Sequence, residues 1–266
     1  MEKLTIEEIY CLSRFGMSTK DILKTHLNAF DRLYDDNAEQ FDEWLDYAES
    51  RFDKQEELGI KTISCQDETY PARLKAISND APSLIFLRGD ASLLTIEKAV
   101  AVIGARAADA QGLDAAFKVG KTFSERGNVI ISGLALGCDK AAHEGCLSGE
   151  GKTIAIVASG LDITHPRENI GLQRQILEHG GLLLSEQLIG VKANPSRLVA
   201  RNRLQAALSQ SVILAQCPEH SGSMHTMRFA RKYRKECLAV NYTKWSEINS
   251  GNRLLIDEGL AKPLYL

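Results

Sequence analysis

Several common functional signals are missing from this chain of 266 residues. No apolar run approaches the roughly 20 residues that a membrane-spanning helix needs, and the acidic start MEKLTIEEIY is unlike a signal peptide. The six cysteines show no C-x-x-C spacing, so they imply neither a zinc site nor a disulfide framework. No G-x-G-x-x-G is present, which argues against NAD. These absences predict a cytoplasmic protein without a metal, a cofactor or a membrane partner.

The net charge of −3 is unevenly spread along the chain. Residues 1–60 contain 15 Asp and Glu against 7 Lys and Arg, whereas residues 192–236 contain 9 Lys and Arg against 2 Asp and Glu. A basic segment in an otherwise acidic chain favours contact with the phosphates of a nucleic acid. A solvated helix surface gives the same pattern, so charge alone leaves both interpretations open.

Two kinds of hydrophobic pattern divide the chain. Residues 1–57 place apolar residues at near-helical spacing, which predicts a small helical domain. From residue 58 onward, short apolar runs such as 99–103 and 128–132 alternate with helical patterns such as 111–126. Runs without internal alternation suit strands that are covered on both faces. Residues 58–266 are therefore predicted to form a Rossmann-like α/β domain with a doubly wound, mostly parallel sheet. Further strands are expected at 61–64, 83–86, 153–158, 182–185, 211–216, 237–240 and 262–266, and further helices at 138–148, 168–179, 201–208, 222–234 and 250–258.

Three glycine-containing turns follow predicted strands, at the edge of a parallel sheet where ligands bind. They are Gly104 to Arg106, Ser132-Gly133 and Ser221-Gly222-Ser223. Backbone N–H groups at such turns can hold a phosphate, and arginine can bind one through two hydrogen bonds. Each turn alone is also compatible with a plain helix cap or a surface arginine. Because all three lie at strand ends, together they predict one anion-binding pocket.

Two further motifs carry charge near these turns. Arg201-Asn202-Arg203 stands at the start of the helix predicted over 201–208, where arginines can bind phosphates and the asparagine a base edge. Asp139 and His143 lie four residues apart on one predicted helix. A contact between them that locks the loop is favoured over a catalytic pair, because no nucleophile is identifiable. The motifs therefore indicate binding rather than catalysis.

The motifs also match one known family in order. They are YPARL, PSLIFLRGD, GAR at 104–106, SGLALGCDKAAHEG at 132–145, SGLDITHPRENIGL at 159–172, LLLSE at 182–186, RNR at 201–203, HSGSMHT at 220–226 and GNRLLIDEG at 251–259. Over residues 58–266 the chain resembles the DNA-processing protein A (DprA/Smf) family. The resemblance implies an extended Rossmann-like fold for residues 58–266. It further implies a non-enzymatic homodimer that binds and protects incoming single-stranded DNA in a basic pocket. It also implies loading of the RecA recombinase during natural transformation.

The resemblance assigns roles to individual residues. Arg106, Arg201 and Arg203 would grip phosphates, and Asn252 and Arg253 would support the pocket from the C-terminal segment. The full set expected to bind DNA is Arg106, Ser132, Gly133, Lys192, Arg197, Arg201, Asn202, Arg203, Ser221, Gly222, Ser223, Thr226, Asn252 and Arg253.

Three positions depart from the family pattern. Ala105 stands where the family usually has serine, and Leu136 where it usually has arginine. Leu198 stands where a phenylalanine usually supports a DNA base, so we expect weaker stacking here. The sequence ends at Leu266, and the winged-helix domain of many members is expected to be absent.

The competing hypothesis is a nucleotide-binding sensor, or a nucleoside-monophosphate phosphoribohydrolase resembling the LOG proteins. Those enzymes carry a P-G-G-x-G-T loop, whereas the equivalent turn here reads E-H-S-G-S-M-H-T without the glycine pair. A metal enzyme built on His220 and His225 lacks a carboxylate or cysteine at ligand spacing. DNA binding is therefore the preferred hypothesis.

Overall fold

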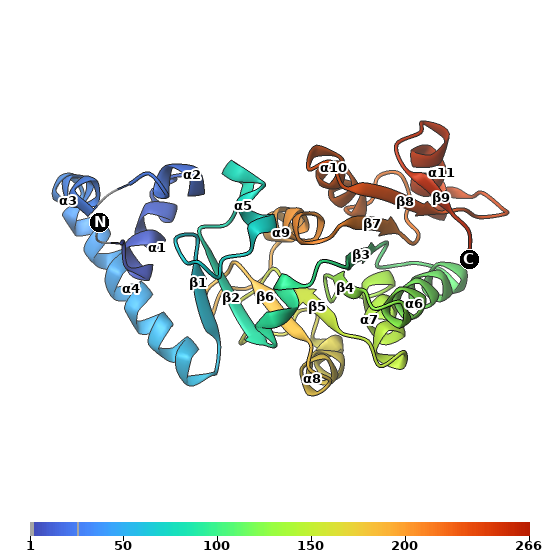
Figure 1. The fold of residues 1–266 in the computed structure, drawn as a ribbon, viewed down its shortest axis with the longest axis horizontal. Helices are drawn as coiled ribbons and strands as arrows, with labels where there is room; N and C mark the ends of the chain where they lie inside the picture. The colour runs from blue at the N-terminus through green and yellow to red at the C-terminus, as the bar shows by residue number, and fades with distance from the viewer. Residues whose placement is uncertain (1–2, 26) are drawn as a thin grey trace.

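One nine-stranded sheet organises the protein, in a computed structural model that describes residues 3–25 and 27–266 (Figure 1). From edge to edge the strands run β1-β2-β6-β5-β4-β3-β7-β8-β9. Neighbours from β6 to β9 in this order pair in parallel, and β1 and β2 add an antiparallel edge. The strands span Lys61–Ser64 (β1), Leu84–Gly89 (β2), Ala99–Ile103 (β3), Val129–Ser132 (β4), Thr153–Ile156 (β5), Leu182–Ser185 (β6), Ser211–Leu214 (β7), Glu236–Val240 (β8) and Lys262–Leu264 (β9).

The sheet confirms the predicted fold class. Every residue of β3, β4, β5, β6 and β7 is buried, which is why these strands read as short runs without alternation. Helices α6, α7 and α8 cover one face of the sheet, and α9 and α10 cover the other (Figure 1). The helices that follow β1 span Ala72–Lys75 (α5), Ala110–Glu125 (α6), Cys138–Ser148 (α7), Ile170–Glu178 (α8), Pro195–Leu208 (α9), Ser223–Lys232 (α10) and Ser250–Asp257 (α11), with 3₁₀ turns at Ser78–Asp80 (η1), Ala91–Thr95 (η2), Arg167–Asn169 (η3) and Glu247–Asn249 (η4).

Four helices precede the sheet and lie beside β1 and β2 (Figure 1). They are α1 (Ile6–Arg14), α2 (Thr19–Ile22), α3 (Leu27–Asp36) and α4 (Ala38–Glu57). Thr5 and Glu8 form a capping box that fixes the start of α1. Ile9 and Phe41 are fully buried and belong to the same hydrophobic core as Phe86 of β2. The division of the chain at residue 57 into two domains stays a prediction.

Helix α9 begins earlier than the sequence analysis predicts. Asn194 caps it by accepting a hydrogen bond from the Arg197 backbone N–H at 2.8 Å, and Pro195 occupies the first turn, where its missing N–H is harmless. The helix therefore starts six residues before the predicted Arg201. The prediction that Arg201 to Arg203 stand at a helix start is thus wrong, because they lie in the middle of α9.

Helices α6 and α7 pack with their backbones in contact. A Cβ atom on Gly120 would lie 2.2 Å from the Ala142 carbonyl oxygen, and one on Gly145 would lie 2.1 Å from the Phe117 carbonyl oxygen. Only glycine allows this approach. Within the described part of the chain, no helix combines the length and the apolar character needed to cross a membrane.

Candidate nucleic-acid interface

A cavity of about 430 Å³ opens at the carboxyl ends of β3, β4 and β7. We call it the α9–α10 pocket, since α9 and the turn that leads into α10 form much of its wall. The turn after β3 and the turn after β7 meet here, and Ala135 brings in the turn after β4. Seven of the residues predicted to bind DNA line the pocket: Arg106, Arg201, Asn202, Ser221, Gly222, Ser223 and Thr226.

A buried charged pair forms the floor of this pocket. Arg201 is only 4% exposed, and Asp139 is 6% exposed. The Nη1 atom of Arg201 donates to the carbonyl oxygens of Gly133, at 2.8 Å, and of Ile156. The Oδ2 atom of Asp139 accepts from the Gly133 N–H at 3.0 Å. A Cβ atom at Gly133 would lie 2.1 Å from Arg201 Nη1, so glycine is required to make room for the guanidinium.

Burial also sets the protonation of the floor. Desolvation lowers the pKa of Arg201 to about 10, although the Asp139 carboxylate opposes this shift. Desolvation raises the pKa of Asp139, against the attraction of Arg201. Arg201 remains a cation at neutral pH, so an anion in the pocket meets positive charge from below.

His143 packs beneath the floor and is fully buried. Its Nδ1 lies 2.7 Å from the Thr153 hydroxyl, which itself donates to the Ile130 carbonyl oxygen at 2.7 Å. Burial, and secondly the charge of Arg201, lower the pKa of His143 to about 3. The predicted contact between Asp139 and His143 is wrong, because Asp139 bonds to Gly133 while His143 turns to the sheet. Asp139 nevertheless holds the loop, through the Gly133 backbone.

The mouth of the pocket carries an exposed cation and a helix start. Arg106 is exposed, and among the described residues it takes part in no ion pair. The Ser223 hydroxyl donates to the Gly104 carbonyl oxygen at 2.8 Å, which ties the turn before α10 to the turn after β3. The amide of Asn202 donates to the Gly222 carbonyl oxygen at 3.4 Å. Arg106 and the N-terminal, positive end of the α10 dipole therefore lie side by side at the mouth.

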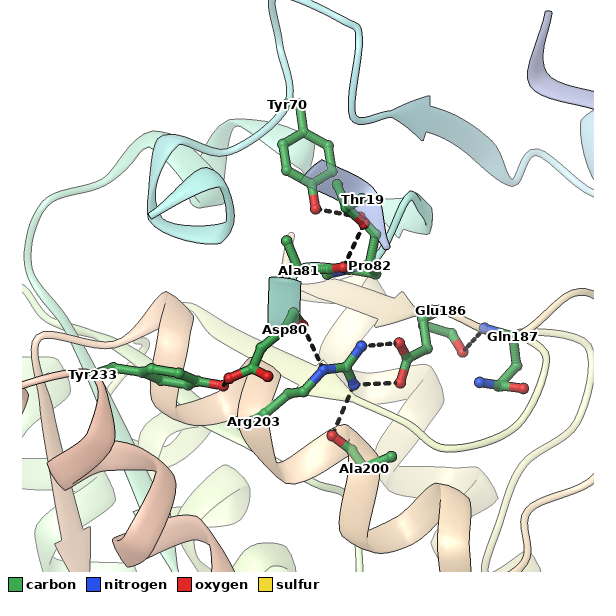
Figure 2. A network of polar contacts seen from close by, with 11 residues as sticks. Thr19, Tyr70, Asp80, Ala81, Pro82, Glu186, Gln187, Ala200, Arg203 and Tyr233 are labelled. Atoms are coloured by element: carbon green, nitrogen blue, oxygen red, sulfur yellow. Dashed lines mark hydrogen bonds and ion pairs between the residues drawn. The ribbon is translucent and has the colours of Figure 1, made fainter. Parts of the chain in front are cut away.

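Arg203 lies outside this pocket, on the other side of α9 (Figure 2). Its Nη1 and Nη2 atoms donate to the Glu186 carboxylate at 2.8 and 2.5 Å, and its Nε atom donates to the Asp80 carbonyl oxygen at 2.6 Å. A fourth bond joins Nη1 to the Ala200 carbonyl oxygen at 2.8 Å. Burial alone would lower the pKa of Arg203, but the bonded Glu186 carboxylate raises it above its ordinary value. Arg203 therefore links α9 to Asp80 of η1 and to Glu186, directly after β6.

The loop that receives Arg203 is held from several directions (Figure 2). Thr19 of α2 donates to the Ala81 carbonyl oxygen at 2.6 Å, and the Tyr70 hydroxyl donates to the Pro82 carbonyl oxygen at 2.5 Å. Tyr233 directly follows α10, and its hydroxyl donates to the Asp80 carboxylate at 2.7 Å. This loop therefore joins the N-terminal helices to the helices that form the α9–α10 pocket.

Other predicted residues hold the frame around the pocket. Ser132 is fully buried and donates to the Val102 carbonyl oxygen at 2.7 Å. Asn252 is fully buried too, and its amide nitrogen lies 2.9 to 3.2 Å from three backbone carbonyl oxygens that follow or end β7 and β8. Arg253 is exposed and pairs with Asp257 on the same helix at 3.2 Å. Neither Ser132, Asn252 nor Arg253 lines the α9–α10 pocket.

Three pocket residues on α9, namely Pro195, Val199 and Gln205, were not among those predicted to bind DNA. Pro195 and Val199 line the pocket because the helix begins before the predicted start. The Asn-Pro pair at 194–195 is a helix-start signal that could have revealed them. Lys192 and Arg197, which were predicted, flank the same turn, where Arg197 Nη1 donates to the Lys192 carbonyl oxygen at 2.9 Å. Across residues 3–25 and 27–266, no group of three His, Cys, Asp or Glu side chains is arranged to hold a metal.

The sheet order and the pocket define an α/β protein with a cavity at the carboxyl edge of a parallel sheet, lined by two arginines. A family model of DNA recombination-mediator protein A matches residues 61–265. The chain therefore belongs to the family of DNA recombination-mediator protein A, also called DprA or Smf.

Individual relatives agree over most of the chain. The chain is 33% identical to DNA processing protein DprA of Streptococcus pneumoniae over 276 residues, covering 97% of this chain and 94% of the relative. It is 34% identical to DprA of Bacillus subtilis, covering 79% of this chain and 69% of that one. The X-ray structure of the S. pneumoniae protein superposes with a TM-score of 0.84 over 99% of this chain and 95% of that one, at 33% identity. DprA of Helicobacter pylori, solved for its single-stranded DNA-binding mode, gives a TM-score of 0.69 at 30% identity over 77% of this chain and 90% of that one.

Proposed function

We propose that this protein binds single-stranded DNA in the α9–α10 pocket and acts by binding rather than by catalysis. The observation that carries the proposal is the pair of cations around the pocket, with Arg201 in the floor and Arg106 at the mouth. Both line the pocket together with the first turn of α10, where the helix dipole favours a phosphate. The family membership and the DNA-binding mode studied in the H. pylori relative support a DNA ligand.

The shape of the pocket favours a single strand over a duplex. A hollow of about 430 Å³ can receive an unpaired base, whereas a duplex keeps its bases stacked inside. Leu198 and Val199 supply an apolar wall against which a base can lie while its phosphate contacts Arg106. In the floor, Asp139 Oδ2 and Arg201 Nη1 are bonded to backbone atoms, which supports a structural rather than a catalytic role for both side chains.

Titration with labelled single- and double-stranded oligonucleotides at several salt concentrations tests this proposal. The single strand should bind more tightly, and the slope of log K against log salt should steepen by about −0.7 for each phosphate neutralised. Arg106→Ala should weaken binding and flatten this slope. Arg126→Ala is the matched control, because Arg126 is exposed at the end of α6, away from the pocket. Tighter duplex binding, or an Arg106→Ala variant that binds like the control, would reject the pocket.

The recombination role extends the same proposal. The family description as a recombination mediator supports transfer of the bound strand to a recombinase, and we name RecA as the partner, in natural transformation. The protein would protect the incoming strand in the cytoplasm and act as a homodimer. RecA-dependent strand exchange on protected DNA, with light scattering for the oligomeric state, tests these points. Release of a free base from a nucleoside monophosphate would instead favour the phosphoribohydrolase hypothesis.

A further inference from the structure

A second cavity, of about 340 Å³, lies between the N-terminal helices and the sheet. We call it the α1–α9 cleft, because Arg14 of α1 and Arg197 of α9 both line it. Leu84, at the start of β2, and Glu186, directly after β6, line it too. Since β2 runs antiparallel to β6, the start of β2 lies at the carboxyl end of β6. The cleft and the α9–α10 pocket therefore open along the same edge of the sheet.

The two cavities are separated only by the first turns of α9. Leu198 lines the α9–α10 pocket, and its neighbour Arg197 lines the cleft. Exposed Lys192 precedes this turn and accepts a hydrogen bond from Arg197 through its carbonyl oxygen. A DNA strand that leaves the pocket over the start of α9 thus passes Lys192 and Arg197 and reaches the cleft.

The cleft carries an excess of positive charge. Three arginines line it against one acid, Glu186, and that acid is bonded to Arg203. Arg14 and Arg197 take part in no ion pair within the described residues. Arg14 is exposed, with its guanidinium against the Tyr10 ring. The first 60 residues hold 15 acidic side chains, yet none from residues 3–25 and 27–60 lines the cleft. The acidic N-terminal segment therefore contributes a cation, Arg14, and no described acid to the cleft.

We propose that the α1–α9 cleft binds the continuation of the strand held in the α9–α10 pocket, with Arg14 and Arg197 contacting successive stretches of its phosphate backbone. This inference rests on the proposed function. Unpaired guanidinium groups suit phosphates, to which they can donate two hydrogen bonds at once. The N-terminal helices thereby become part of the DNA-binding surface, although their own charge is acidic.

Oligonucleotide length separates the two cavities in an experiment. A strand of about 5 nucleotides serves as the probe of the pocket alone, and a strand of about 20 exceeds the roughly 4–16 nucleotides of a single binding module. Arg14→Gln should leave the affinity for the short strand unchanged. For the long strand it should remove one phosphate contact, which lowers the salt slope by about 0.7 and weakens binding about five-fold at 0.1 M salt. Arg197→Gln should behave likewise, and the double variant should lose about 25-fold.

Arg32→Gln supplies the matched control, since Arg32 is exposed on α3 and does not line the cleft. Thermal unfolding of each variant verifies that the fold is retained. Equal losses on short and long strands, or no loss on the long strand, would overturn the cleft proposal. Failure of the wild-type protein to bind either strand would instead overturn the proposed function. Because Arg106→Ala must weaken both lengths, the two failures are distinguishable.

Discussion

Replacing Arg203 by alanine should destabilise the fold while leaving the α9–α10 pocket intact. The guanidinium makes four hydrogen bonds, two of them to Glu186, and the two side chains are only 16% and 13% exposed. Removal of one partner leaves the other charge in a poorly hydrated site. Such truncation costs about 3–5 kcal/mol for a fully buried pair, so we expect about 2–4 kcal/mol here. The sequence analysis instead assigned this residue to a phosphate.

A double-mutant cycle measures the interaction directly. Arg203→Met and Glu186→Leu should each lower the free energy of unfolding in urea, and the two changes together should cost less than their sum. Each kcal/mol lost should lower the melting temperature by about 2–4 °C. Affinity for a strand of about 5 nucleotides should stay within two-fold of wild type, because the pocket does not include either side chain. Unchanged unfolding together with a large loss of short-strand affinity would refute this reasoning and return Arg203 to the DNA.

Three further predictions concern the pocket and its floor. Gly133→Ala should lower the free energy of unfolding in urea by about 1–3 kcal/mol, because the new methyl group displaces the Arg201 guanidinium. A variant as stable as the wild type would contradict the described packing. Leu198→Phe should tighten binding of ordinary oligonucleotides by up to several-fold, because base–aromatic stacking contributes about 1–3 kcal/mol, and it should not tighten binding of abasic ones. A lower melting temperature without any gain in affinity would show that Leu198 only packs against the protein. His143 has a pKa of about 3 in the fold, so the unfolded chain binds its proton first as pH falls. Stability should therefore fall between about pH 6.5 and 3, by up to about 1.4 kcal/mol per pH unit, and His143→Gln should lose that part of the pH dependence.

The sheet could be predicted from the sequence because burial on both faces leaves a visible mark. A run such as Ala99–Ile103 has no polar residue to alternate, and this run ends where the turn at Gly104 begins. The contact between the turns at Gly104 and Ser223 could also be predicted, because the carboxyl ends of parallel strands lie at one edge of the sheet. The predicted start of α9 at residue 201 was wrong, because the Asn-Pro pair at 194–195 begins the helix six residues earlier.

The separate roles of the two arginines in the RNR motif could not be predicted. Residues two apart on a helix point about 200° apart, so Arg201 and Arg203 face opposite sides of α9. Arg201 meets the Gly133 backbone, 68 residues away in sequence, and Arg203 meets Asp80, 123 residues away. Neither partner is visible in the local sequence, and only the folded chain shows which arginine faces the pocket.

Gly145 and Asn252 belong to stretches that the chain shares with its family, yet neither lines the α9–α10 pocket. Gly145 lets two helix backbones touch, and the side chain of Asn252 bonds to backbone atoms. Selection for stable folding alone would preserve such residues in a relative that does not bind DNA. The exposed Arg106 can be lost without harm to folding. In a genome survey, such shared stretches therefore report a common fold, and under the proposed function the side chain at the position of Arg106 is the better marker of a member that binds DNA.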